Sequence, residues 1–258
     1  MERRLYWILS DFLVLVGRSL KHIFKNMDQL LSLTIQPVMF MLLFGYVFGG
    51  AIQTGGVSYI NFLVAGILVQ MSAFGATTTS LSIATDMRRG IIDRLKTLPI
   101  LSSAVMVGHV TADLVRNLVS AAVLIAVAFL MGFRPVASVS DWLAIVGLLI
   151  IFTLAISWLF TIAGLLAKSI EAVQWMGFFI VFPLTFASAA FVPTESMPKY
   201  LRIFAENQPV THTIEAIRAY MLGLPVGSHA LIATLWWLAV IAITIPVAGS
   251  LFRTRILS

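Results

Sequence analysis

The sequence contains no cysteine and few charged residues. The absence of cysteine excludes a disulfide framework, a thiolate metal site and a cysteine nucleophile. Charged residues make up 11% of the 258 residues, whereas a soluble domain averages about 25%, and 60% of the chain is hydrophobic. No charged residue at all occurs between Gln29 and Thr85. This composition indicates a protein of the lipid bilayer.

The signatures of several enzyme classes are also missing. No H-E-x-x-H metal motif and no G-x-S-x-G nucleophile elbow occurs, and the four histidines are far apart in the sequence. No glycine is followed by lysine, so the chain lacks the P-loop that holds nucleotide phosphates. A membrane enzyme with an unrecognised site is therefore kept only as an alternative.

Two further functional classes are disfavoured by where the charges lie. A carrier driven by an ion gradient usually has carboxylates in mid-membrane, and the apolar segments here hold none away from an end. The net charge is +6, but no stretch is long and polar enough to form a basic nucleic-acid-binding domain. We therefore expect no nucleic-acid partner.

Six apolar segments are each long enough to cross the ~30 Å hydrocarbon core as a helix. Pro37 lies inside the first, where neighbouring helices can satisfy the carbonyl that a proline frees. The segments cover residues 30–48, 59–84, part of 103–131, 142–167, 173–192 and 229–252. The sequence thus predicts an all-α polytopic membrane protein, with a six-helix transmembrane domain over residues 29–258.

The distribution of lysine and arginine predicts which side the loops face. Six spans place both termini on one side, and that side carries thirteen of the seventeen basic residues and seven of the eleven acidic residues. The other side carries four residues of each sign. Because cytoplasmic loops are enriched in basic residues, both termini are predicted to be cytoplasmic.

Residues 1–28 are predicted to form an amphipathic helix along the inner membrane surface. Charges run throughout this segment, so it lacks the clean apolar core of a removable signal peptide. A merely solvated helix is the alternative, but it would expose a large apolar stripe beside a bilayer, so we favour contact with membrane lipids. The apolar residues at helical spacing are Leu5, Ile8, Phe12, Val16, Leu20 and Ile23.

A second amphipathic helix is predicted over residues 86–98, in the cytoplasmic loop between the second and third spans. One face is apolar, the other carries charges of alternating sign, and Pro99 ends the helix. The segment is either a docking surface for a cytoplasmic partner or a plain solvated connection, and periodicity alone favours the connection. The apolar face holds Met87, Ile91, Leu95 and Leu98, and the charged face holds Asp86, Arg89, Asp93 and Lys96.

The segment 193–228 is too long for a simple outer turn and is predicted to form a re-entrant helical hairpin. Its first helical piece runs to Asn207, where Pro209 breaks it, and its second is capped by Thr211 or Thr213. Each piece has about a dozen residues or fewer, ~15 to 18 Å of helix, which cannot cross the bilayer. The hairpin is therefore expected to dip in and return, near a pathway or a subunit interface.

Polar residues near the inner end of the third span are interpreted as local features. Asp113 and Arg116 lie three residues apart, so a self-neutralising pair is preferred to a position in a transport pathway. His109 is expected to be a satisfied residue near a helix end. The hydroxyls from Thr77 to Ser80 are expected to bond their own helix, with a cavity lining as the alternative.

Two stretches resemble a known family. The cytoplasmic run from Gly90 to Pro99 resembles the coupling-helix motif of ABC-2 type transporter permeases, in which glycine, an acid and Leu-Pro recur in that order, and the daunorubicin-resistance group is the most similar. The outer stretch resembles the re-entrant segment of that group, although it has an inserted glutamine and a glutamate in place of a common aspartate. The residues that carry this second likeness are Asn207, Gln208, Pro209, Glu215 and Arg218.

The resemblance implies the membrane half of an ATP-driven exporter in the cell membrane of a prokaryote. Two such permeases, identical or paired with a sister chain, would sit over two nucleotide-binding ATPase subunits. Those subunits would hold ATP and magnesium, so this chain is expected to bind no cofactor and to be no enzyme itself. The cargo would be a hydrophobic drug, lipid or glycan. The alternative is a non-transporting membrane scaffold or an enzyme with an unrecognised site.

The resemblance also implies that closure of the ATPase subunits would be carried into the spans by residues 86–98. The re-entrant hairpin itself is expected to plug the outer end of the pathway. Its charged residues Glu206, Glu215 and Arg218 either pair within the hairpin or hold an outer gate shut until ATP closure, and we favour pairing for Glu206 and the gate for Glu215 with Arg218. The residues expected to couple to the ATPase are Asp86, Arg89, Gly90, Asp93, Arg94, Leu95, Leu98 and Pro99. Those expected at the outer gate are Asn207, Pro209, Glu215 and Arg218.

Overall fold

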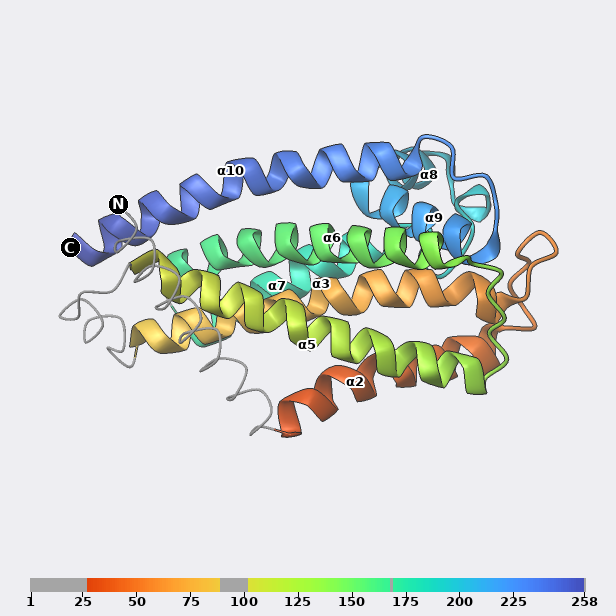
Figure 1. Cartoon of the computed structure of the whole chain (residues 1–258), viewed down its shortest axis with the longest axis horizontal. Helices are drawn as coiled ribbons and strands as arrows, with labels where there is room; N and C mark the ends of the chain where they lie inside the picture. The colour runs from red at the N-terminus through yellow and green to blue at the C-terminus, as the bar shows by residue number, and fades with distance from the viewer. Residues whose placement is uncertain (1–26, 89–101, 168, 258) are drawn as a thin grey trace.

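The computed structural model describes residues 27–88, 102–167 and 169–257, and within these ranges every regular element is a helix (Figure 1). The predicted interfacial helix lies outside the described residues except for its last two, which belong to the first described helix. The predicted loop helix lies outside them from Arg89 onward. The all-α prediction is confirmed for the described part of the chain.

Each predicted apolar segment corresponds to a helix. α2 covers Met27–Leu42 and continues as the π-helix η1 over Leu43–Phe48. By length and composition, α3, α5, α6 and α10 are candidate membrane spans, while Thr34–Phe48 and Ile170–Phe186 are shorter apolar helices. The remaining apolar helices are α3 Tyr59–Arg88, α5 Ser102–Leu130, α6 Val139–Leu166, α7 Ile170–Phe186 and α10 His229–Leu257.

Three short helices lie between α7 and α10, namely η2 Thr194–Ser196, α8 Lys199–Asn207 and α9 Pro209–Leu222. α8 and α9 gather at one end of the bundle, and the C-terminal end of α10 lies at the other (Figure 1). The links from α2 to α3 and from α5 to α6 share the end with α8 and α9. This common location agrees with the predicted alternation of the helices. α9 packs against α10, α3 and α6.

α3 is the central helix of the bundle and contacts α2, α5, α6, α7 and α9. Other helices and the segment after α7 approach it closely at glycines, where an added Cβ would overlap a neighbouring atom. Small residues are the usual means of packing membrane helices, since lipid provides no hydrophobic force between them. The close pairs are Gly66 with Ala190, Gly75 with Asn117, Gly164 with Ser80 and Gly177 with Thr77.

The fifth apolar helix is shorter than the sequence predicted. α7 ends at Phe186, with Pro183 in its last turn, whereas a helix was expected over residues 173–192. Residues 187–193 turn instead, and their freed carbonyls accept hydrogen bonds from side chains that are distant in the sequence. The early end of α7 therefore depends on tertiary contacts. The donors are Gln208 to Ala187, Arg218 to Ala189 and Tyr59 to Phe191.

The second outer helix begins earlier than the sequence predicted. α9 starts at Pro209 and is not capped by Thr211 or Thr213. Proline suits the first helical position because the N–H that it lacks would have no partner there. The Thr211 hydroxyl instead accepts from the Ala189 N–H at 3.3 Å, and the Thr213 hydroxyl accepts from the Trp237 indole at 2.8 Å. Both threonines therefore join α9 to its neighbours.

Gly66 provides a test of the close contact between α3 and residues 187–193. Gly66→Ala would drive a Cβ into the carbonyl oxygen of Ala190. Because the contact is backbone on both sides, no side-chain rotation relieves it, and we expect a loss of about 2 kcal/mol or more in stability. In the control Gly147→Ala, the added Cβ meets no atom within 4 Å. Thermal unfolding in detergent compares the two variants, and equal melting temperatures would contradict the close contact between Gly66 and Ala190.

Candidate functional site

Asp86 is the one predicted ATPase-coupling residue within the described ranges. Its Oδ2 lies 3.0 Å from Nε2 of His109, which joins α3 to α5 near their predicted inner ends. His109 is therefore a satisfied residue, as expected. The other predicted coupling residues lie outside the described residues, so their function stays a prediction; they are Arg89, Gly90, Asp93, Arg94, Leu95, Leu98 and Pro99.

Arg218 of α9 is buried at the predicted outer end, and only 4% of its side chain is exposed. Its Nε donates to the Phe62 carbonyl at 3.1 Å, and its Nη2 donates to the Ala189 carbonyl at 2.6 Å. Its Nη1 forms an ion pair with Glu215, three residues earlier. The guanidinium carbon also lies 3.6 Å from the centroid of the Phe62 ring, a cation–π distance. We call Arg218, Glu215 and residues 187–193 the outer joint.

The structure brings together only part of the predicted outer gate. Glu215 pairs with Arg218, and Pro209 begins α9. Asn207 is exposed, and its side chain donates to the Ile203 carbonyl of its own helix at 2.8 Å. Asn207 therefore lies outside the outer joint.

Gln208 belongs to the outer joint, although it was not among the predicted gate residues. It is 5% exposed, and its Nε2 donates to the Ala187 carbonyl. Its Oε1 has no partner. In the sequence Gln208 is only an insertion in an Asn-Pro turn. The available signal was that a polar residue directly before a helix-starting proline cannot continue the preceding helix and has to find partners elsewhere.

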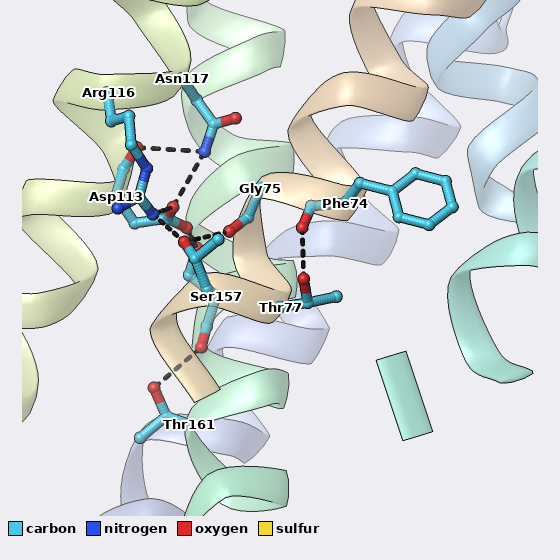
Figure 2. Close-up of polar contacts among 9 residues, drawn as sticks. Phe74, Gly75, Thr77, Asp113, Arg116, Asn117, Ser157 and Thr161 are labelled. Atoms are coloured by element: carbon cyan, nitrogen blue, oxygen red, sulfur yellow. Dashed lines mark hydrogen bonds and ion pairs between the residues drawn. The ribbon is translucent and has the colours of Figure 1, made fainter. Parts of the chain in front are cut away.

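A second polar centre lies inside the bundle, where α3, α5 and α6 meet (Figure 2). Nη2 of Arg116 binds both the Asp113 carboxylate and the Thr78 hydroxyl. The other carboxylate oxygen of Asp113 accepts from Ser157 at 2.5 Å, and Asn117 donates to Asp113 at 3.1 Å. We call these five residues the polar cluster.

The polar cluster confirms the predicted pair of Asp113 and Arg116 and corrects its setting. Their side chains are 1% and 7% exposed, and Asp113 lies seven residues inside the candidate span Met106–Leu130, about 10 Å along the helix. Ionisable groups at such depth need partners from other helices. Thr78 is one of these partners, although its hydroxyl also donates to the Gly75 carbonyl of its own helix at 2.7 Å.

An aromatic ladder joins α7 to η1 through Phe191 of the segment after α7. It passes from partly exposed rings on α7 to the buried ring of Phe191 in the outer joint, and then to η1. Successive ring centroids are 5.0, 4.1, 4.7, 4.5 and 5.2 Å apart along Phe178, Phe182, Phe186, Phe191, Phe44 and Phe48.

A small, open pocket between α2 and α3 adjoins this ladder. Gln70 on its wall is 3% exposed, and its Nε2 has no hydrogen-bond partner. The pocket is therefore mostly apolar with one unused buried donor. Its lining residues are Gln36, Pro37, Phe40, Gln70, Met71 and Phe74.

Arg218→Lys tests whether the outer joint needs the forked guanidinium. Lysine keeps the charge but cannot reach the Phe62 and Ala189 carbonyls and Glu215 together, so we expect a loss of about 3 kcal/mol in stability. The control is Arg202→Lys. Arg202 pairs with Glu206 at 2.7 Å on the surface of α8, with side chains 44% and 40% exposed, so its replacement should leave the melting temperature almost unchanged. Thermal unfolding measures both, and an unaffected Arg218→Lys protein would contradict the proposed contacts.

The amino-acid sequence matches the ABC-2 type transporter family over residues 10–222. The daunorubicin resistance ABC transporter permease DrrB1 of Streptomyces coeruleorubidus is 31% identical over 218 residues, which cover 81% of this chain and 76% of the relative. The probable doxorubicin resistance ABC transporter permease DrrC of Mycobacterium tuberculosis is 26% identical over 252 residues, 93% of this chain and 86% of the relative. The inner membrane transport permease YadH of Escherichia coli is 25% identical over 233 residues, 85% of each chain.

The family match includes both stretches that carried the resemblance and extends through the helices from α2 to α9. The apolar helices of the structure agree with it, since four of them are candidate membrane spans. The chain therefore belongs to the ABC-2 type transporter family of transport permeases.

Proposed function

We propose that this chain is the membrane-spanning subunit of an ATP-binding-cassette exporter that moves a hydrophobic drug, lipid or glycan outward. The family match indicates a transport function, and two relatives are named as daunorubicin and doxorubicin resistance permeases. The observation that carries the proposal is the aromatic ladder, because stacked and partly exposed rings offer an apolar molecule successive surfaces along the bundle.

The pocket beside the ladder suits an apolar cargo that carries an oxygen atom. The buried Nε2 of Gln70 has no partner, so it would gain a hydrogen bond if the pocket widened and a carbonyl or hydroxyl oxygen of a bound molecule reached it. Leu43 and Tyr46 on η1 and Phe179 on α7 are exposed beside the ladder. A second permease copy, or a sister permease, would cover these residues and close the ladder from the lipid.

ATP hydrolysis is proposed to act through residues 86–98, as in the family whose coupling helix they resemble. Nucleotide-binding subunits would hold ATP and magnesium, and this chain would supply the docking surface. The bond between Asp86 and His109 supports the proposal, because it ties together the two helices that flank this loop. A displacement of the loop would then move α3 and α5 together.

Six crossings of a prokaryotic cell membrane are proposed, with both termini in the cytoplasm. α7 has 17 residues, about 25 Å of helix, which is slightly shorter than the ~30 Å hydrocarbon core. Residues 187–193 would complete this crossing as open backbone, protected by the side chains of the outer joint. α8 and α9 would form the re-entrant hairpin on the outer side.

The outer joint is proposed to be the outer gate. Arg218, which pairs with Glu215 of its own helix, ties α9 to α3 and to the segment after α7, beside Phe191 at the outer part of the ladder. Asn207 and Pro209 would form the turn of the hairpin that moves when the gate opens. ATP-driven closure at the inner side would release this contact and let cargo leave the ladder.

The proposed orientation can be tested with single cysteines, because the native chain has none. Gln53 and Ser196 are exposed near the predicted outer end, and Thr254 is exposed near the predicted inner end. We expect Gln53→Cys and Ser196→Cys to react with a membrane-impermeant thiol reagent in intact cells. Thr254→Cys should react only after permeabilisation. Labelling in the reverse pattern would overturn the orientation.

Export can be tested with the permease co-purified with its ATPase and reconstituted in liposomes. We expect daunorubicin to raise ATP turnover and to be transported. Phe182→Ala should lower transport about tenfold, because it removes two ring contacts of the ladder. Phe129→Ala is the matched control, since Phe129 is 42% exposed against 38% for Phe182 but lies outside the ladder.

The outcomes of this experiment separate the proposed function from its alternatives. Equal losses in the Phe182 and Phe129 variants would remove the ladder from the transport path. A wild-type protein that binds no ATPase, and whose liposomes show no ATP-dependent transport of drug or lipid, would favour a non-transporting membrane scaffold or enzyme.

A further inference from the structure

We propose that Arg116 changes its hydroxyl partner on α3 during turnover, leaving Thr78 for Thr79. The polar cluster is then a two-position contact between α3 and α5, and Arg116 is a positioning residue of the transport cycle. This inference rests on the proposed function, because it places at the contact between α3 and α5 a movement that the ATPase would drive.

Thr78 and Thr79 lie on either side of the line of α3 that runs through Gly75. They follow Gly75 by three and four residues, the two spacings that place side chains on one helix face a turn further on. Gly75 marks the line of closest approach to α5, since a Cβ at this position would overlap the side chain of Asn117. Figure 2 shows Gly75 on α3 beside the cluster. Thr78 and Thr79 therefore flank the line along which α5 packs.

The observed arrangement leaves hydrogen-bonding capacity unused on both helices. On α5, Nε of Arg116 is buried without a partner, while Nη2 serves both Thr78 and Asp113. On α3, Thr79 is 2% exposed and its hydroxyl has no partner. A buried donor and a buried acceptor without partners each reduce stability. An arrangement in which Nε of Arg116 donates to the Thr79 hydroxyl therefore competes in stability with the observed arrangement.

Asp113 keeps the guanidinium of Arg116 beside α3 while its partner there changes. The carboxylate accepts from Ser157 of α6 at 2.5 Å and from Asn117 of α5 at 3.1 Å. Neither of these bonds involves the hydroxyls of Thr78 or Thr79. The exchange therefore leaves the ion pair intact, and no buried charge has to stand alone.

The movement would enter from the inner ends of α3 and α5, which flank residues 89–101. Thr79 lies nine residues before Arg88, the last residue of α3, about 14 Å along the helix. Thr78 and Thr79 are about 100° apart around the helix axis. A rotation of α3 by part of a turn, together with the flexible stem of Arg116, brings the second hydroxyl to the guanidinium.

Thr79→Val tests the exchange, because it removes a hydroxyl that bonds nothing in this structure and keeps a branched side chain. Removing an unpaired buried hydroxyl should not lower stability, and a merely structural residue would leave turnover unchanged. The exchange predicts a melting temperature at or above that of the wild type and a fall of about fivefold in ATP turnover by the assembled complex, since one hydrogen bond is lost from one of two states. Vesicle transport of daunorubicin should fall in parallel.

Two further variants make the result specific to the hydroxyl. Thr77→Val is the matched control, since the Thr77 hydroxyl donates to the Phe74 carbonyl of its own helix at 2.7 Å, and it should keep wild-type turnover. Thr79→Ser retains the hydroxyl without the methyl group, and it should restore turnover. Wild-type turnover in Thr79→Val, or an equal loss in Thr79→Ser, would overturn the exchange while leaving the proposed function in place. A wild-type complex without permease-dependent ATP turnover or transport would overturn the proposed function, and the exchange with it.

Discussion

Residues 187–193 are open backbone inside an apolar bundle, and their hydrogen bonds are supplied by side chains of other helices. A polar backbone group without a partner in such surroundings costs about 2 to 7 kcal/mol, so the segment can exist only where donors are held against it. Gln208, Arg218 and Tyr59 provide three of them. The docking of α9 on α3 and the close approach at Gly66 follow from this requirement.

α3 links the outer joint to the polar cluster and to the predicted inner end. Its Phe62 carbonyl accepts from Arg218, its Thr78 hydroxyl binds Arg116, and its Asp86 binds His109. The helix has 30 residues and is about 45 Å long, and it is almost continuously buried along its outer half. Because a packed helix shifts or rotates as a unit, a displacement at one of these contacts reaches the other two.

The sequence was sufficient to locate the six apolar helices, because composition alone separates them from the loops. Two ion pairs were also predictable, since Asp113 with Arg116 and Glu215 with Arg218 are three residues apart on a helix. The other hydrogen-bond partners could not be predicted, because they are distant in the sequence. The threonine that binds Arg116 is 38 residues from it, and the donors to residues 187–193 are 21 to 132 residues from their acceptors. Local patterns carry no information about such contacts. The coupling residues rest on a motif and stay predictions.

The two buried arginines differ in how fully their donors are used. Nε of Arg116 is unpaired, whereas Arg218 bonds through Nε, Nη1 and Nη2. Among the acceptors of Arg218, Glu215 is 33% exposed, so water can replace its bond at small cost. Separation from the carbonyls of Phe62 and Ala189 would instead leave buried groups unpaired. The bonds of Arg218 to these two carbonyls would therefore hold the proposed outer gate shut, because the ion pair with Glu215 lies within α9 and joins no second segment.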